Sequence, residues 1–461
     1  MTTHLAVPGL VVGSEAVESR IASSTAAVAA RRRAAWELYE SLPMPDPRSD
    51  EDWRRTPLRG LDPATFVTDP GPTDHGEALV AALRALRDEL DPQAGFLATT
   101  RNGVRAFDGL DILHAQGVIV TTLQRAAERH PEVLERGLSL VDPTVAQRSG
   151  HGDAKWLALW NALWRDGVFV HVPAGVEARV PIVAAYSAGG ERPAITPATV
   201  VVLEPMSSLT LVEIHASPPG DQPLFSDTVT SLVVGQSARL NHCILQRLGA
   251  GAWHMAMHRS RLDRDAQLTQ FVATLGSHLQ KTYIETILDG QGADARIGGV
   301  CFGSGKQHLD HQSLQAHVAP RTVSDLFLKV AVRDEATSVY SGLIDVAEGA
   351  QQMNGYVQNR NLMLSKGAKA TGIPRLEIRA DDVRCSHGVT AGHIDDEQRF
   401  YLRSRGVREA DANRIIVRGF MQDALDRCPH EGFAALVGRL MDEAVAGADL
   451  AGVAPGAEDV Q

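Results

Sequence analysis

The spacing of hydrophobic residues changes twice along the chain. In residues 17–167 it is mostly helical, as in Gly76–Leu90, where Leu79, Leu83 and Leu86 recur at intervals of three and four. Thr25–Glu40 is rich in Ala, Arg and Glu and is followed by three closely spaced prolines, which predicts a helix with a sharp end. The same region predicts short strands in Gly103–Thr122 and further helices in Leu123–Arg136 and Asp153–Asp166.

Residues 168–394 have a different pattern, with short hydrophobic runs rich in Val, Ile, Leu and Thr. Thr199–Leu203, Leu209–Ile214 and Val229–Val234 are examples, and turn residues follow each one closely. Small turns that end in Ala precede the runs repeatedly, as in Gly235–Ala238 and Asp334–Ala336. Irregular units of this size are typical of the coils of a β-solenoid, although a β-sandwich also has many short strands.

The last region, residues 395–448, returns to helical spacing. Asp395 or Asp396 is a suitable N-cap for a helix that ends before Gly406. Two amphipathic helices are predicted after it, in Asn413–Arg427 and Phe433–Val445. The predicted organisation is therefore a disordered tail (1–16), a mostly helical domain (17–167), a β-solenoid (168–394), a helical domain (395–448) and a second disordered tail (449–461).

Composition narrows the class of protein. The chain has 461 residues and a formal net charge of -11, which disfavours non-specific binding to nucleic acid. Its four cysteines form no CxxC pair, so they predict neither a zinc ribbon nor a disulfide framework and suit a reduced, cytoplasmic protein. No signal peptide and no run of apolar residues long enough to span a membrane is expected.

Two glycine-rich tracts resemble nucleotide-binding motifs but lack essential parts. Gly303–Gln307 has Gln307 where a phosphate-binding loop needs Ser or Thr, and no helix is predicted after it. Gly290–Ala295 leads into a strand-like segment, whereas a dinucleotide-binding fingerprint leads into a helix. Both tracts are interpreted as turns, so ATP hydrolysis by this chain is not expected.

Polar side chains gather in the second half of the predicted solenoid. His308, Asp310, His311 and His317 lie close together in sequence, and we interpret them as solvent-facing residues of one coil in preference to a metal site. A β-helix enzyme acting on polysaccharides is an alternative, since carboxylates and a lysine could group on one face. The residues concerned are Asp310, Asp325, Lys329 and Asp345.

Cys385 and His387 lie where the last predicted strand leads into the first C-terminal helix. In an extended strand both side chains point to the same face, roughly 7 Å apart. Thiolate and imidazole both bind iron, and Arg384 is expected to lower the pKa of the neighbouring thiol. On its own, a single Cys-x-His pair is more often structural than functional.

The tract around this pair resembles the SufB/SufD family of iron–sulfur cluster assembly proteins. The similarity runs from Asp381–Asp382 through Cys385-Ser386-His387-Gly388 to Phe400–Gly406, and it extends over most of the chain. Asn359–Ser365, Lys306–His311 and Asp52–Thr56 also fit the family. The Cys-Ser-His-Gly sequence, and Leu402 after Phe400-Tyr401, favour the SufD branch over a SufB-type scaffold.

The resemblance implies a right-handed parallel β-helix between two helical domains, with no catalytic residues of its own. It implies binding to a SufB-like paralogue through the β-helix and to a SufC-like ABC ATPase, which hydrolyses ATP, through the C-terminal helices. A homodimer is also possible. Cys385 and His387 correspond to the family's functional pair, for cluster assembly and iron acquisition, with iron or a cluster held only transiently at the subunit interface. Candidate ATPase-binding residues are Phe400, Tyr401, Leu402, Arg405, Ile416 and Phe420.

Overall fold

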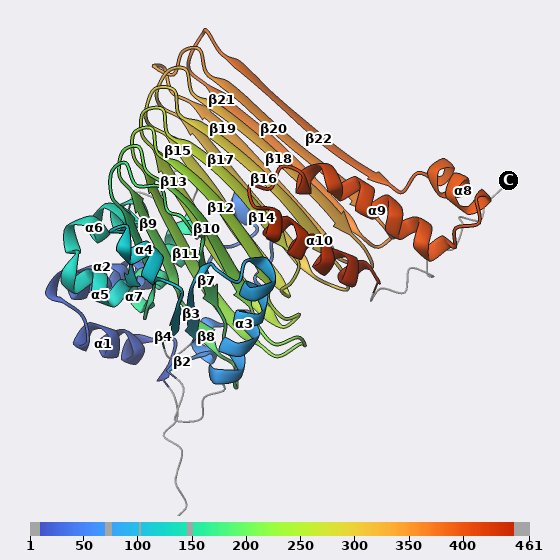
Figure 1. Ribbon diagram of the computed structural model, residues 1–461. Helices are drawn as coiled ribbons and strands as arrows, with labels where there is room; N and C mark the ends of the chain where they lie inside the picture. Colours follow the sequence, from blue (N-terminus) through green and yellow to red (C-terminus); the bar gives the residue numbers. More distant parts are fainter. Residues whose placement is uncertain (1–9, 70–75, 101–102, 145–150, 447–461) are drawn as a thin grey trace, which may run out of the picture.

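The N-terminal region combines helices with short strands. The computed structural model describes residues 10–69, 76–100, 103–144 and 151–446 (Figure 1). Its first elements are β1 (Leu10–Val11), α1 (Ser14–Ala22), α2 (Ala26–Ser41), the 3-10 turns η1 (Glu51–Trp53) and η2 (Pro63–Thr65), β2 (Val67–Asp69), α3 (Gly76–Leu90), β3 (Gly95–Thr100), β4 (Gly103–Asp108), α4 (Asp111–Ala115), β5 (Ile119–Thr122), α5 (Leu123–Arg129), α6 (Pro131–Leu140) and α7 (His151–Leu163).

The central region is a parallel β-solenoid, as the short hydrophobic runs predict. Its strands are β6 (Gly167–Val172), β7 (Ile182–Tyr186), β8 (Ala194–Ile195), β9 (Ala198–Leu203), β10 (Ser208–Ala216), β11 (Leu224–Val234), β12 (Arg239–Arg247), β13 (Ala252–Leu262), β14 (Gln267–Thr274), β15 (Leu279–Leu288), β16 (Asp294–Gly303), β17 (His308–His317), β18 (Val323–Val332), β19 (Thr337–Val346), β20 (Asn354–Met363), β21 (Lys369–Ile378) and β22 (Arg384–His393).

From β9 onward, successive long strands alternate between two sheets. The β22 sheet runs in the order β22-β20-β18-β16-β14-β12-β10-β7-β3-β4, and the β21 sheet in the order β21-β19-β17-β15-β13-β11-β9-β6-β5. Each long strand pairs in parallel with the strand one coil earlier, without a register shift. This stacking excludes the β-sandwich.

The predicted Ala-ending turns form corners of the coils. Ser237, Asp265 and Asp334 have φ values of 56°, 55° and 57°, in the left-handed region that turns the chain between coils. The alanine after the turn is buried each time, as at Ala238 and Ala336. A small side chain is required there because the corners stack directly on one another. Gly303–Gln307 and Gly290–Ala295 are also connections between strands, with no helix after them.

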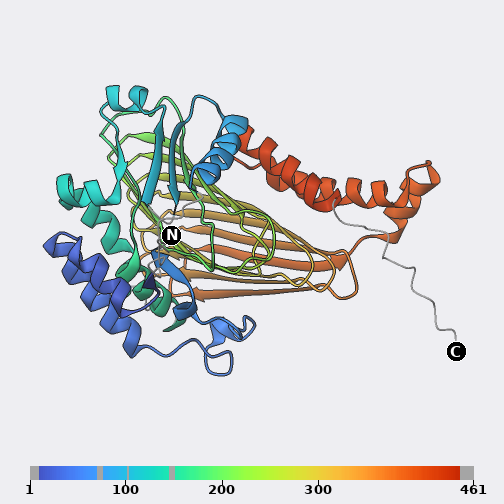
Figure 2. The same cartoon turned by 90° about the horizontal axis from the view of Figure 1, so that it is seen from below.

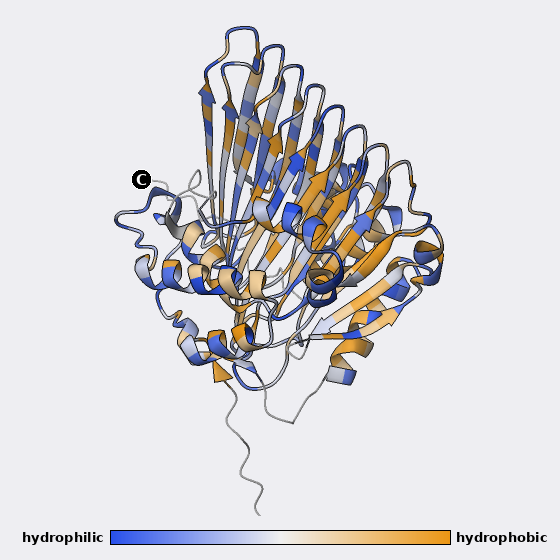
Figure 3. Ribbon diagram, turned by 90° about the vertical axis from the view of Figure 1, so that its left-hand side faces the viewer, coloured by the Kyte–Doolittle hydropathy of each residue, from blue (hydrophilic) through white to orange (hydrophobic). Residues whose placement is uncertain are grey.

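Successive side chains along each strand point alternately to an inner face, toward the solenoid core, and to an outer face. Figure 3 shows hydrophobic and hydrophilic segments alternating along the strands. The inner face forms ladders, one of which passes through Leu203, Val234, Leu262 and Leu288 and is buried throughout. Burial of such ladders is the main source of stability in a solenoid.

The outer faces of the two sheets are covered by different helices. Helices α5, α6 and α7 pack on the β21 sheet, whereas α3 packs on β3 and β7 of the β22 sheet. The C-terminal helices α8 (Asp396–Ser404), α9 (Glu409–Leu425) and α10 (Glu431–Ala446) follow β22. α9 packs on β16 and β18, and α10 packs on α3 and α9. Helices α5, α6 and α7 therefore lie on the opposite side of the solenoid from α9 and α10, whereas α3 lies beside α10. Helix α8 projects away from the solenoid (Figure 2).

Some predicted boundaries differ from the observed elements. Gly103–Thr122 contains α4 between its two strands, and the 17–167 region also supplies β3, β4 and β5 to the two sheets. Helix α1 starts at Ser14, inside the predicted tail. Positions 1–9 and 447–461, which include the second predicted tail, lie outside the described residues. None of the helices in the described ranges combines the length and apolar composition needed to cross a bilayer.

Candidate functional site at the open end of the solenoid

The solenoid ends in a coil that no later element covers within the described part of the chain. β22 and β21 are the terminal strands of their sheets and each pairs with a neighbour on one side only. Their side chains are mostly exposed or half-buried, in contrast to the wholly buried strands of earlier coils. Leu376 and Ile378 of β21 are 36% and 42% exposed although they lie on the inner face. The last coil thus presents both unpaired backbone groups and uncovered apolar side chains.

Cys385 and His387 both lie on the inner face of β22, as their spacing predicts. The register places Cys385 beside Gly355 and His387 beside Val357, which is buried in the inner core. His387 is thereby the last rung of a ladder that contains Leu326 and Val357. It is exposed because no further coil stacks on it, while Cys385 is half-buried against the inner core. The imidazole therefore faces the open end.

Arg384 does not activate the thiol as expected. Arg384 is exposed, and alternation along β22 turns it to the opposite face from Cys385. Burial raises the pKa of Cys385, which disfavours the thiolate. His387 is consequently the more available of the two groups for chemistry at the open end.

Gly372 allows the two sheets to approach each other closely near the open end. A Cβ added at Gly372 of β21 would lie 2.4 Å from Cγ1 of Val389 and 3.2 Å from Oδ1 of Asn359. The side chains of β20 and β22 therefore occupy the space that a larger residue would need. The coil remains regular through this position, because β19 and β21 pair without a shift.

Helix α8 carries the most exposed aromatic residues of the described chain. Phe400 and Tyr401 are 73% and 56% exposed. The side chain of Asp395 accepts a hydrogen bond from the backbone N–H of Glu397 at 2.8 Å, which confirms it as the N-cap. The Arg405 guanidinium lies 4.9 Å from the centre of the Tyr401 ring. Phe400 and Tyr401 also line an open hollow of about 930 Å³, to which Leu402 and Ile416 contribute.

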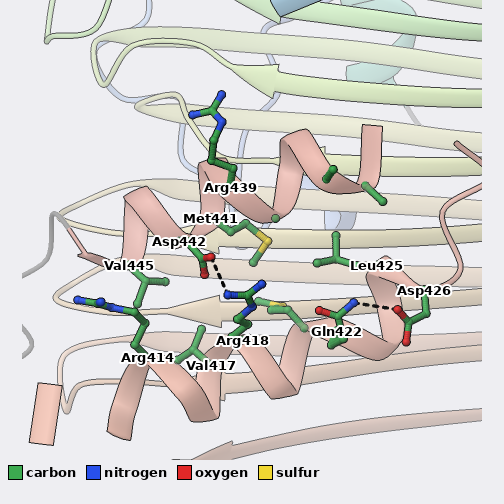
Figure 4. Close-up of a pocket in the computed structure, with 14 residues that line it drawn as sticks. Arg414, Val417, Arg418, Gln422, Leu425, Asp426, Arg439, Met441, Asp442 and Val445 are labelled. Atoms are coloured by element: carbon green, nitrogen blue, oxygen red, sulfur yellow. Dashed lines mark hydrogen bonds and ion pairs between the residues drawn. The ribbon is translucent and has the colours of Figure 1, made fainter. Parts of the chain in front are cut away.

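A groove of about 420 Å³, separate from the hollow beside α8, lies between α9 and α10 (Figure 4). Its apolar lining includes Val417, Met421 and Met441. An ion pair between Arg418 and Asp442 joins the two helices at 3.2 Å. The groove therefore has an apolar lining with charged groups beside it, a combination common in protein interfaces.

Phe420 is turned toward the solenoid. Its ring packs against the core under the C-terminal helices, and the Lys329 ammonium lies 4.5 Å from the ring centre. Lys329 also donates a hydrogen bond to the backbone oxygen of Phe420 at 2.5 Å and forms an ion pair with Asp423. Phe420 thus fixes α9 to the solenoid, whereas Phe400, Tyr401 and Ile416 face outward or line the open hollow.

The solvent-facing interpretation of the histidine cluster is wrong, because Asp310, His311 and His317 are buried and His308 is half-buried, on two different faces. On the outer face Asp310 accepts hydrogen bonds from Thr56 and from Lys281, the latter at 2.6 Å. On the inner face His311 lies 3.0 Å from the Thr274 hydroxyl, and His317 contacts two further hydroxyl groups. Within the described residues, no three His, Cys, Asp or Glu side chains form a group suited to a metal ion.

The four polar residues that could have formed the catalytic group of a polysaccharide-active enzyme do not lie together. Asp310 and Asp345 belong to the β21 sheet, whereas Asp325 and Lys329 belong to the β22 sheet. Asp325 forms an ion pair with Arg427 at 3.1 Å, and Asp345 forms one with Arg379. These pairs lie on separate surfaces, so the carboxylates have structural partners and do not form a catalytic group.

Sequence reasoning missed a buried polar cluster inside the first coils. Glu213 is 1% exposed, and its carboxylate lies 2.7 Å from Nε2 of His242 and 3.5 Å from Nε2 of His215. Burial alone would raise the pKa of Glu213, but the hydrogen bond with His242 and the nearby imidazole of His215 hold it well below its usual value. Glu213 and His215 alternate with hydrophobic residues in sequence. That spacing could have shown that both side chains lie on one face of the strand.

Comparisons with known proteins find a matching family model and related proteins that cover most of the chain. The family model described as "SUF system FeS cluster assembly, SufBD core domain" matches residues 186–420. The iron-sulfur cluster assembly protein SufD of Bacillus subtilis is 26% identical over 405 residues, which cover 87% of this chain and 90% of that protein. SufD of Escherichia coli is 28% identical over 84% of this chain and 86% of its own length. SufB of Bacillus subtilis is 24% identical over 71% of this chain and 69% of its own length.

Proposed function

The chain belongs to the SufBD core domain family of the SUF system for FeS cluster assembly, and on that premise we propose that it is a SufD-type assembly subunit without ATPase activity of its own. The two SufD proteins are matched over a larger share of both chains than SufB is, which favours the SufD type. The two glycine-rich tracts that only resemble nucleotide-binding motifs, Gly303–Gln307 and Gly290–Ala295, lie at connections between strands and are not followed by a helix. ATP hydrolysis is then the task of a separate, SufC-like subunit, in the cytoplasm.

The observation that carries this proposal is the position of His387 at the open end of the solenoid. An edge strand pairs readily with a strand of another chain, because its backbone N–H and C=O groups on one side are unpaired. A SufB-like paralogue is the proposed partner at β21 and β22, and a second copy of this chain is the alternative occupant. Such pairing would enclose Cys385 and His387 in the interface.

The chemistry proposed at this interface concerns iron or a nascent cluster as cargo. A neutral imidazole binds ferrous iron through a ring nitrogen and can also accept a proton. His387 is exposed at the end of its ladder and suits either role. Cys385 is the weaker candidate, since burial raises its pKa and a thiol must lose its proton to bind iron.

The C-terminal helices are the proposed docking site for the ATPase. Phe400 and Tyr401 expose large aromatic surfaces on a helix that projects from the body. Aromatic residues contribute disproportionately to binding energy in protein interfaces. The hollow that includes Ile416 and the groove between α9 and α10 would receive side chains of that partner.

The experiment is cluster formation by the complex reconstituted from this chain with SufB-like and SufC-like subunits. His387→Ala should reduce the rate of cluster formation about tenfold or more, because it removes a ligand or proton acceptor at the interface. His393→Ala is the matched control, since His393 lies on the same strand and is also exposed. Equal rates for wild type and His387→Ala would refute a chemical role for this residue.

A further inference from the structure

Two cysteines far apart in sequence meet where the C-terminal helices cross the solenoid wall. The Sγ atoms of Cys243 and Cys428 are 4.0 Å apart, although 185 positions separate the residues. Cys243 lies on the outer face of β12, in the apolar cluster that also contains Leu245, Phe271 and Phe433. Cys428 lies in the short connection, residues 426–430, that joins α9 to α10. The pair thus spans the contact between two regions of the fold.

We propose that Cys243 and Cys428 form a redox-active thiol pair that closes to a disulfide when a peroxide or a small-molecule disulfide reaches Cys428. The bond would fasten the α9–α10 connection covalently to strand β12. This inference concerns the thiols of the chain itself and holds whether or not the proposed assembly function is correct.

The geometry favours this pair over the other two cysteines. A disulfide needs the sulfurs about 2 Å apart, so they must approach by about 2 Å. Cys243 is held in a regular strand, so the approach requires a movement of Cys428, which lies outside the two helices in their connection. Cys301 is wholly buried inside the solenoid and Cys385 lies on the last coil.

Accessibility sets the order in which the two thiols react. Cys428 is half-buried, whereas Cys243 is completely buried, so a reagent from solution meets Cys428 first. The hydrogen bond from the Cys243 thiol lowers the pKa of Cys428, and burial opposes this effect. Burial raises the pKa of Cys243. Cys428 is therefore the attacking group, and Cys243 is the resolving group.

With hydrogen peroxide the reaction balances in two steps. The Cys428 thiolate, whose proton passes to solvent, attacks one peroxide oxygen; an S–O bond forms, the O–O bond breaks, and hydroxide leaves and is protonated to water. The Cys243 sulfur then attacks the Cys428 sulfenic acid. The S–S bond forms, the S–O bond breaks, and the hydroxyl group leaves as water with the Cys243 proton. Two thiols lose two electrons in total, and one peroxide becomes two waters.

Closing the pair would reinforce a contact that is otherwise non-covalent. The C-terminal helices are held by the apolar cluster around Phe433, by Lys329 and by the Arg427–Asp325 ion pair at 3.1 Å. A cross-link between positions this distant strongly restricts the unfolded chain and the detachment of the helices. Oxidation should therefore slow hydrogen exchange in α9 and α10.

The test uses the full chain, reduced and then exposed to equimolar hydrogen peroxide or, separately, to oxidised glutathione. Wild type should lose two of its four thiols together and yield a Cys243–Cys428 cross-linked peptide by mass spectrometry. Its thermal midpoint should rise, and dithiothreitol should reverse both changes. The Cys301→Ser/Cys385→Ser variant keeps only the pair and should behave in the same way.

Two outcomes would overturn the proposal. One is a stable glutathione adduct on Cys428 with Cys243 still free. The other is loss of both thiols without the linked peptide, in wild type and in Cys301→Ser/Cys385→Ser. Cys428→Ser must abolish the link and the rise in thermal midpoint. This residue is only half-buried, so the variant should fold even if the buried Cys243→Ser does not.

Discussion

The two ends of the solenoid are built in opposite ways. At the first end, antiparallel pairing of β4 with β3 and of β5 with β6 terminates the sheets, and α4 helps to cover the inner core. At the last end, β21 and β22 leave apolar residues and His387 uncovered. A solenoid needs a cap at each end to remain monomeric and soluble. The first end is therefore capped by the chain itself, and the proposed function assigns the covering of the last end to a partner.

The largest expected effect is a difference between the two ends in the free energy of unfolding lost when a leucine is replaced by alanine. Leu211→Ala removes a fully buried side chain from the inner core near the first end and should lower the free energy of unfolding by about 3 kcal/mol. Leu376→Ala makes the same change on the inner face of the exposed last coil and should cost about 1 kcal/mol or less. Urea denaturation measures both. Equal losses would show that the last coil is as well packed as the first.

A further effect, smaller than that of Leu211→Ala within any one pH unit, should appear as a pH dependence of stability that arises from the interior between the two ends. Burial lowers the pKa of His311 to about 4, so this imidazole stays neutral in the folded state. Unfolding exposes it, and its pKa returns to about 6.5. The free energy of unfolding should therefore fall as pH drops from about 6.5 to 4, by up to about 1.4 kcal/mol per pH unit from this residue.

His311→Gln should reduce this slope. Gln keeps a polar group near the Thr274 hydroxyl but has no titrating proton. Denaturation at pH 7, 6 and 5 measures the slope in both proteins. Burial also lowers the pKa of His317 to about 4, so part of the wild-type slope should remain. An unchanged slope would mean that His311 is hydrated in the folded protein.

The sequence predicted the features that depend on local periodicity. The solenoid, the C-terminal helices, the Asp395 cap and the shared face of Cys385 and His387 all follow from alternation, helical spacing and turn residues. The similarity around Phe400–Gly406 then identified the family, which the comparison with known proteins confirmed.

The features that the sequence did not predict depend on distant segments. His308 and Asp310 were expected to face solvent, because nothing local shows that Thr56 lies over them. The elevated pKa of Cys385 also follows from packing and not from its neighbour Arg384. For the same reason the contact of Cys243 with Cys428 could not be predicted, since it depends on where α9 and α10 lie on the β22 sheet.

The most direct test of the open end is hydrogen exchange of this chain with and without a SufB-like subunit. Backbone amides of β21 and β22 should become protected in the complex, while those of β3, β4 and β5 at the first end should not change. His387→Ala should keep this protection, which would separate binding from cluster chemistry. Protection confined to the first end, or no protection of β21 and β22 in a complex that demonstrably forms, would contradict the account.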